Sequence, residues 1–106
     1  MSDRIEQLKA FLAEDPGDSF IRYALAKEYE GMGQMYQARD AYLALKKDDP
    51  TYVGLYYHLG KLYEELGEEE EALATYTEGI NVAKKATDFH ALSELNTAKV
   101  NLEMGI

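Results

Sequence analysis

The chain has 106 residues, of which 20 are acidic and 11 basic, and its formal net charge at pH 7 is −9. This balance argues against a sequence-independent grip on nucleic acid and against docking on anionic lipid, because both need clustered lysine and arginine. With no cysteine and no run of about 18 apolar residues, the chain is expected to be a soluble cytoplasmic protein without disulfides or a membrane span.

Apolar residues recur at helical spacing in six segments, and none of these segments shows the alternation typical of a strand. The segments cover residues 3–14, 19–32, 35–47, 53–66, 69–85 and 88–103. Pro16 and Pro50 lie between segments, where the residue before a proline is pushed out of the α conformation. Gly33 and Gly67 mark two further turns. The sequence therefore predicts an all-α fold of about six antiparallel helices.

Four glutamates, residues 68–71, stand at the start of the fifth segment. Acidic side chains at a helix N-terminus meet the positive end of the helix dipole, so a structural role is the favoured interpretation. A cation site is the weaker alternative, because neighbouring residues on a helix do not converge on one point.

Residues 19–52 and 53–86 align without a gap, which defines an internal repeat of 34 residues. A fixed period of this length is typical of a stacked helical solenoid. The identical positions are Tyr23/Tyr57, Leu25/Leu59, Lys27/Lys61, Tyr29/Tyr63, Glu30/Glu64, Gly33/Gly67, Ala38/Ala72 and Tyr42/Tyr76.

The second repeat reads Tyr56-x₂-Leu59-Gly60-x₂-Tyr63, then Ala72-x₃-Tyr76, and the first keeps this spacing from Leu25 to Pro50. The pattern resembles the tetratricopeptide repeat family, which builds helix–turn–helix units of 34 residues. The resemblance implies a right-handed helix–turn–helix solenoid in one domain over residues 1–106. Its parts would be a half-repeat helix (3–14), repeat one (19–52), repeat two (53–86) and a capping helix (87–104).

The chain departs from the family pattern at three places. Arg22 replaces the opening aromatic residue of repeat one, and Lys84 replaces the closing proline of repeat two. In the last helix, a continued 34-residue step would bury three polar residues, Ser93, Glu94 and Thr97. A step of 36 residues instead aligns Leu92, Leu95 and Leu102 with Tyr56, Leu59 and Leu66. We therefore expect a longer turn around residues 85–88, followed by a terminal cap.

Proteins of this family generally bind peptides or other proteins in a concave groove lined by the first helix of each unit. The resemblance places in such a groove Phe20, Tyr23, Ala24, Lys27, Glu30, Gly54, Tyr57, His58, Lys61, Glu64, Glu65, His90, Glu94 and Thr97. Eight of these are the candidate partner-binding residues: Phe20, Tyr23, Lys27, Glu30, Tyr57, His58, Lys61 and Glu64. The Lys, Asn and Arg residues with which some members hold an acidic C-terminal peptide are not matched, so that activity is not expected.

Two interpretations of the recurring tyrosine, lysine and glutamate stay open. The tyrosines can pack between helices while lysine and glutamate form solvated pairs worth a few tenths of a kcal/mol. Alternatively, the tyrosines supply rigid contact area beside two ammonium groups, which suits a recognition surface.

The favoured function is therefore a non-catalytic interaction module for a peptide or protein partner, without nucleic acid, membrane, metal or cofactor. His58 and His90 have no neighbours at metal-ligand spacing, and no nucleophile or phosphate-binding motif occurs. The alternative is a self-assembling helical unit that forms a weak homo-oligomer through the C-terminal helix. Its contact would use Leu92, Leu95, Val100 and Met104.

Overall fold

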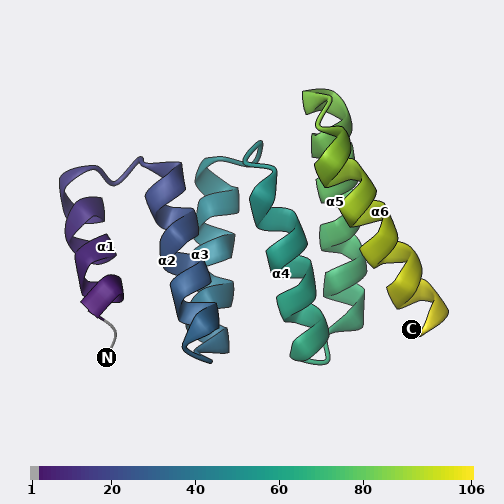
Figure 1. The fold of residues 1–106 in the computed structure, drawn as a ribbon, viewed down its shortest axis with the longest axis horizontal. Helices are drawn as coiled ribbons and strands as arrows, with labels where there is room; N and C mark the ends of the chain where they lie inside the picture. The colour runs from purple at the N-terminus through teal and green to yellow at the C-terminus, as the bar shows by residue number, and fades with distance from the viewer. Residues whose placement is uncertain (1–2) are drawn as a thin grey trace. The chain divides into compact units, whose positions relative to one another are not determined.

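The computed structural model describes residues 3–106, and this part of the chain contains six α-helices and no strand (Figure 1). The helices are α1 (Asp3–Glu14), α2 (Ser19–Gly31), α3 (Met35–Asp48), α4 (Gly54–Glu65), α5 (Glu69–Ala86) and α6 (Phe89–Met104). Each begins and ends within one residue of its predicted segment. The predicted all-α helical-repeat class is confirmed. None of the described helices is long and apolar enough to cross a membrane.

The chain divides after Tyr52 into two compact units. The first unit holds α1, α2 and α3, and α2 packs against both of its neighbours. The second unit holds α4, α5 and α6, and each of these helices packs against the other two. A single domain over residues 1–106 stays a prediction, and its residues 1 and 2 lie outside the described range.

The core of the first unit forms where neighbouring helices face one another. Each helix contributes apolar residues that are three or four positions apart in the sequence. Ile5 and Leu8 of α1 meet Leu25 of α2, and all three are at most 9% exposed. On α3, Tyr42 and Leu45 are completely buried. This stripe on each helix is what the helical period of the sequence predicted.

In the second unit, two glycines each make room for a tyrosine of the facing helix. A Cβ atom on Gly60 of α4 would lie 2.2 Å from Cε1 of Tyr76 on α5. A Cβ atom on Gly79 of α5 would lie 2.5 Å from Cβ of Tyr56 on α4. Since real Cβ atoms do not approach so closely, this reciprocal arrangement requires glycine at both positions.

The turns inside the repeats use glycine for a conformational reason. Gly33 and Gly67 have φ values of 74° and 76°, in the left-handed region that side chains with a Cβ rarely adopt. The predicted turn positions are confirmed, and each turn lets the two helices of a repeat fold back on one another.

The predicted long turn around residues 85–88 is wrong. Helix α5 has 18 residues where α3 has 14, and only residues 87 and 88 separate it from α6. The reason is the residue at one repeat position. Pro50 prevents the helix from continuing in repeat one, whereas Lys84, 34 residues later, allows it to continue in repeat two. Helix α5 ends at Ala86 with Thr87 as its C-cap, whose φ is 52°. Asp88 caps α6 by accepting a hydrogen bond from the Ala91 N–H.

The 36-residue step into the last helix is consistent with the burial of α6. Leu95 is 1% exposed and Ala98 is 7% exposed, whereas the three polar residues 93, 94 and 97 are exposed. The burial of Leu95 corrects the predicted self-association contact, because this side chain belongs to the core of the second unit. Val100 and Met104 of that contact are 48% and 67% exposed.

Candidate functional site

The first unit carries a pocket of about 290 Å³ between α1 and α2, called here the first-unit pocket. Its lining residues are Arg4, Phe20, Tyr23, Ala24, Lys27 and Glu28. All but Arg4 lie on α2 at helical spacing, so they share one face of that helix. Three of the predicted partner-binding residues, Phe20, Tyr23 and Lys27, therefore lie together.

Tyr23 is the centre of a ring cluster in the first unit. Its ring centroid lies 5.2 Å from that of Tyr52 and 6.3 Å from that of Tyr42, and both pairs are tilted. The Lys27 Nζ atom lies 5.5 Å from the centroid of the Tyr23 ring, which is cation–π distance. The ring is thus held by its neighbours and presents a fixed platform with an ammonium group beside it.

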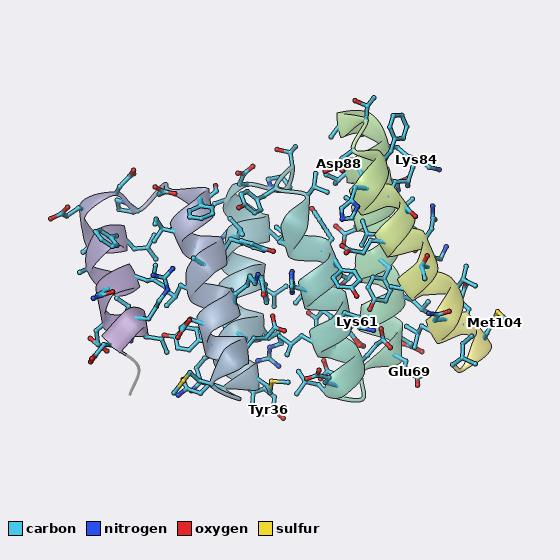
Figure 2. All side chains as sticks on the ribbon, viewed as in Figure 1. Tyr36, Lys61, Glu69, Lys84, Asp88 and Met104 are labelled. Carbon is cyan, nitrogen blue, oxygen red and sulfur yellow. The ribbon has the colours of Figure 1, made fainter. Side chains whose placement is uncertain are left out.

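The second unit carries a pocket of about 270 Å³ between α4 and α6, called here the second-unit pocket. Its lining residues are Tyr57, Lys61, His90, Ser93, Glu94, Thr97, Ala98 and Asn101. Lys61 lies on α4 (Figure 2) and lines this pocket, and its Nζ atom lies 3.8 Å from an oxygen of Glu64. Tyr57 and Lys61 repeat Tyr23 and Lys27, and we call the two sets the tyrosine–lysine pairs.

Glu30 and Glu64 have a structural role that the repeat alignment did not indicate. The buried hydroxyl of Tyr42 donates a hydrogen bond to Glu30, and that of Tyr76 donates one to Glu64. Burial raises the pKa of both tyrosines, and the hydrogen bond and negative charge of the glutamate raise it further. The recurrence of glutamate at this position of both repeats is thus explained by the hydrogen bond that it accepts from the hydroxyl of a core tyrosine.

The structure separates the eight predicted binding residues into two groups. Five of them, Phe20, Tyr23, Lys27, Tyr57 and Lys61, line one of the two pockets. The other three do not line either pocket: Glu30 and Glu64 hold the core tyrosines, and His58 is half-buried. The His58 ring lies edge-on to Tyr57, with centroids 5.7 Å apart.

Sequence reasoning missed part of the lining of each pocket. In the second-unit pocket the missed residues are Ser93, Ala98 and Asn101; Ser93 and Asn101 continue the polar stripe of His90, Glu94 and Thr97 along α6. Their spacing of three and four residues was a usable signal. In the first-unit pocket the missed residues are Glu28 of α2 and Arg4 of α1. Glu28 follows Ala24 at helical spacing, whereas no comparable signal predicted Arg4, because its contact depends on how α1 packs against α2.

Acidic side chains do not gather into a metal centre in the described part of the chain. Within residues 3–106 no group of three or more His, Asp or Glu side chains is placed to hold a metal ion. The glutamates 69, 70 and 71 lie in the first turn of α5, with Glu68 at its N-cap, as the dipole argument predicted. Figure 2 shows Glu69 at the start of that helix.

Comparison with known proteins places the chain in a family. A tetratricopeptide repeat family model matches residues 53–85. The crystal structure of a tetratricopeptide repeat domain protein from Salinibacter ruber is 45% identical, with a TM-score of 0.79, and the match covers 81% of this chain and 97% of that one. The chain belongs to the tetratricopeptide repeat family. It is thereby assigned to a class of protein–protein interaction modules, and none of these similarities points to an enzyme.

Two more distant similarities cover most of this chain. A solution structure of a Bordetella parapertussis protein is 27% identical, with a TM-score of 0.85, and the match covers 99% of this chain and 91% of that one. Subunit 3 of the anaphase-promoting complex of Dictyostelium discoideum is 27% identical over 89 residues, 84% of this chain. The chain spans only 9% of the length of that subunit.

Proposed function

We propose that the chain binds a peptide or protein segment through its two tyrosine–lysine pairs. Binding in the concave groove of the family, which the resemblance implies, is part of this proposal. The observation that carries it is the recurrence of the same pair in a pocket of each unit, Tyr23 with Lys27 and Tyr57 with Lys61.

The chemistry of the pairs suits recognition of a polypeptide. A tyrosine ring offers a large contact surface with few rotatable bonds, so little conformational entropy is lost when a partner covers it. An adjacent ammonium group adds a charge that attracts carboxylates and repels basic segments. The name of the Dictyostelium relative, a subunit of a multi-protein complex, agrees with a role in assembly.

The decisive experiment reverses the two lysines together. In a pull-down from lysate of the source organism, we expect Lys27→Glu/Lys61→Glu to lose a protein that the wild type captures. With that protein purified, calorimetry should show binding weakened by at least about tenfold, because two attractive charges become repulsive. Far-UV circular dichroism should show an unchanged fold, since both lysines are exposed.

A matched control carries the same change in net charge away from the pockets. Lys9 of α1 and Lys85 of α5 are exposed and line neither pocket. The variant Lys9→Glu/Lys85→Glu should retain the partner. Equal loss in both double variants, or no loss in either, would contradict binding at the tyrosine–lysine pairs.

Self-association through α6 is a second candidate, favoured by the exposure of Val100 and Met104. In light scattering across a concentration series, a homo-oligomer would show a rising average mass that the variant Val100→Ser/Met104→Ser abolishes. A constant monomer mass at the highest concentration would exclude this function.

A further inference from the structure

One of the repeat positions that differ between the two units holds Phe20 in the first unit and Gly54 in the second. Phe20 stands near the start of α2 and is 64% exposed. One exposed phenyl ring is ordinary on a protein surface. This ring, however, forms a wall of the first-unit pocket, whereas Gly54 is absent from the lining of the second-unit pocket.

The walls of the two pockets accordingly have different chemistry. The first-unit pocket combines the rings of Phe20 and Tyr23 and the methyl group of Ala24 with two cations and one carboxylate. The second-unit pocket is lined mainly by hydrogen-bonding side chains of α6, including Ser93 and Asn101. An apolar group therefore gains more from entering the first pocket than the second.

We propose that the first-unit pocket takes one apolar side chain, of about leucine size, from a partner segment that carries carboxylates beside it. The inference rests on the proposed function and adds to it the chemistry of the ligand. A volume of about 290 Å³ is at the small end of ligand pockets and suits one side chain rather than a larger molecule.

The charges at the pocket favour acidic neighbours of that side chain. Lys27 is exposed, and its ammonium group stands beside the Tyr23 ring that walls the pocket. Arg4 supplies a second cation and Glu28 a single carboxylate, so the lining has an excess of positive charge. In a chain with a net charge of −9, this excess is local, and it selects for an acidic segment only at short range.

Three capped tripeptides test the inference in a titration of ¹⁵N-labelled protein followed by NMR. Acetyl-Asp-Leu-Asp-amide should shift the amide signals of Phe20, Tyr23 and Lys27. Its dissociation constant should be about fivefold lower than that of acetyl-Asp-Ala-Asp-amide, which lacks most of the apolar side chain. It should also be lower than that of acetyl-Ser-Leu-Ser-amide, which lacks the carboxylates.

Three phenylalanine variants test the role of the Phe20 ring. Phe20→Ala should abolish the preference for leucine over alanine, and Phe20→Leu should restore most of it. Phe89→Ala should leave the preference unchanged, because Phe89 is similarly exposed, at 75%, but lies on α6 outside both pockets. Circular dichroism of each variant verifies that the helices remain.

The outcomes separate this inference from the proposed function. Equal affinity for the leucine and alanine peptides would overturn the apolar anchor, while a Lys27-dependent interaction would still support the proposed function. Absence of any shift in the first unit at about 10 mM peptide would also overturn the inference. Loss of the captured partner in the double lysine variant remains the separate test of the function itself.

Discussion

In the second unit, the side chain of Tyr56 is 1% exposed and lies against Gly79, where a Cβ atom would not fit. The corresponding residues of the first unit, 34 positions earlier, are Arg22 and Leu45. Arg22 does not fill the core: its Nε donates a hydrogen bond to the Pro16 carbonyl at 2.8 Å, and its Nη1 lies 3.3 Å from an oxygen of Asp48. In the second unit the large Tyr56 packs against the small Gly79. In the first unit Leu45 stands at the position of Gly79, and Arg22, at the position of Tyr56, stays outside the core.

The two units also differ where the first helix of each repeat approaches the buried tyrosine of the second. The buried tyrosine of the second helix is present in both units, as Tyr42 and Tyr76, and donates to a glutamate in each. The residue of the first helix at the close approach is Ala26 in one unit and Gly60 in the other. Because Gly60 has the Tyr76 ring where a Cβ would stand, the same repeat position tolerates a methyl group in one unit only. Repeat equivalence therefore does not imply equal tolerance of substitution.

The largest expected loss of stability comes from replacing Tyr56, and the equivalent Arg22 is expected to contribute much less. Tyr56→Ala should reduce the free energy of unfolding by about 3–5 kcal/mol, because it empties a buried aromatic site. Arg22→Ala, at the equivalent position, should cost less than about 1 kcal/mol, because its ion pair is partly exposed. Urea unfolding followed by far-UV circular dichroism measures both. Losses of equal size would show that the two positions have the same role after all.

An alkaline titration probes what the units share. The pKa of Tyr42 and of Tyr76 is raised in the folded state, whereas in the unfolded chain it is near 10. Their contribution to stability is therefore complete below pH 10 and is lost above it, by up to about 2.7 kcal/mol per pH unit for two groups. Urea unfolding between pH 9 and about 11 measures this slope.

The control for this titration is Tyr42→Phe/Tyr76→Phe, which removes both hydroxyls and keeps both rings. At pH 7 each change should cost about 1.5 kcal/mol, because a hydrogen bond to a charged group is lost. Above pH 10 the variant should lose less stability than the wild type. An unchanged slope would mean that these hydroxyls are not linked to alkaline unfolding.

A smaller effect is expected at the close approach of α4 and α5. Gly60→Ala should cost about 2 kcal/mol, because the added methyl group overlaps the buried Tyr76 ring. Gly31→Ala is the matched control, since nothing lies within 4 Å of a Cβ on Gly31 and its helical conformation suits alanine. That control should be neutral or stabilising by up to about 1 kcal/mol. Thermal unfolding would contradict the packing argument if Gly60→Ala behaved like the control.

Much of the fold could be predicted because its determinants are close together in the sequence. Pro16, Pro50 and the left-handed glycines Gly33 and Gly67 set the helix ends locally. The one wrong turn, at residues 85–88, was predictable on the same basis: Lys84 stands where Pro50 ends α3, so α5 continues. The pockets were predictable only in part, since the resemblance identified the α2 and α4 faces and three residues of α6 but not Arg4 of α1, which meets the α2 face.

The amino-acid sequence by itself determined six helices, their ends and the repeat, because helix formation depends on neighbours three and four residues apart. Only the tertiary structure decided which of the recurring tyrosine, lysine and glutamate residues line a pocket. In the alignment, the recurring glutamates Glu30 and Glu64 look as available for binding as the recurring lysines. Each glutamate, however, accepts a hydrogen bond from a tyrosine 12 residues away on the facing helix. Such a partner is selected by the packing of one helix on another, which local periodicity does not specify.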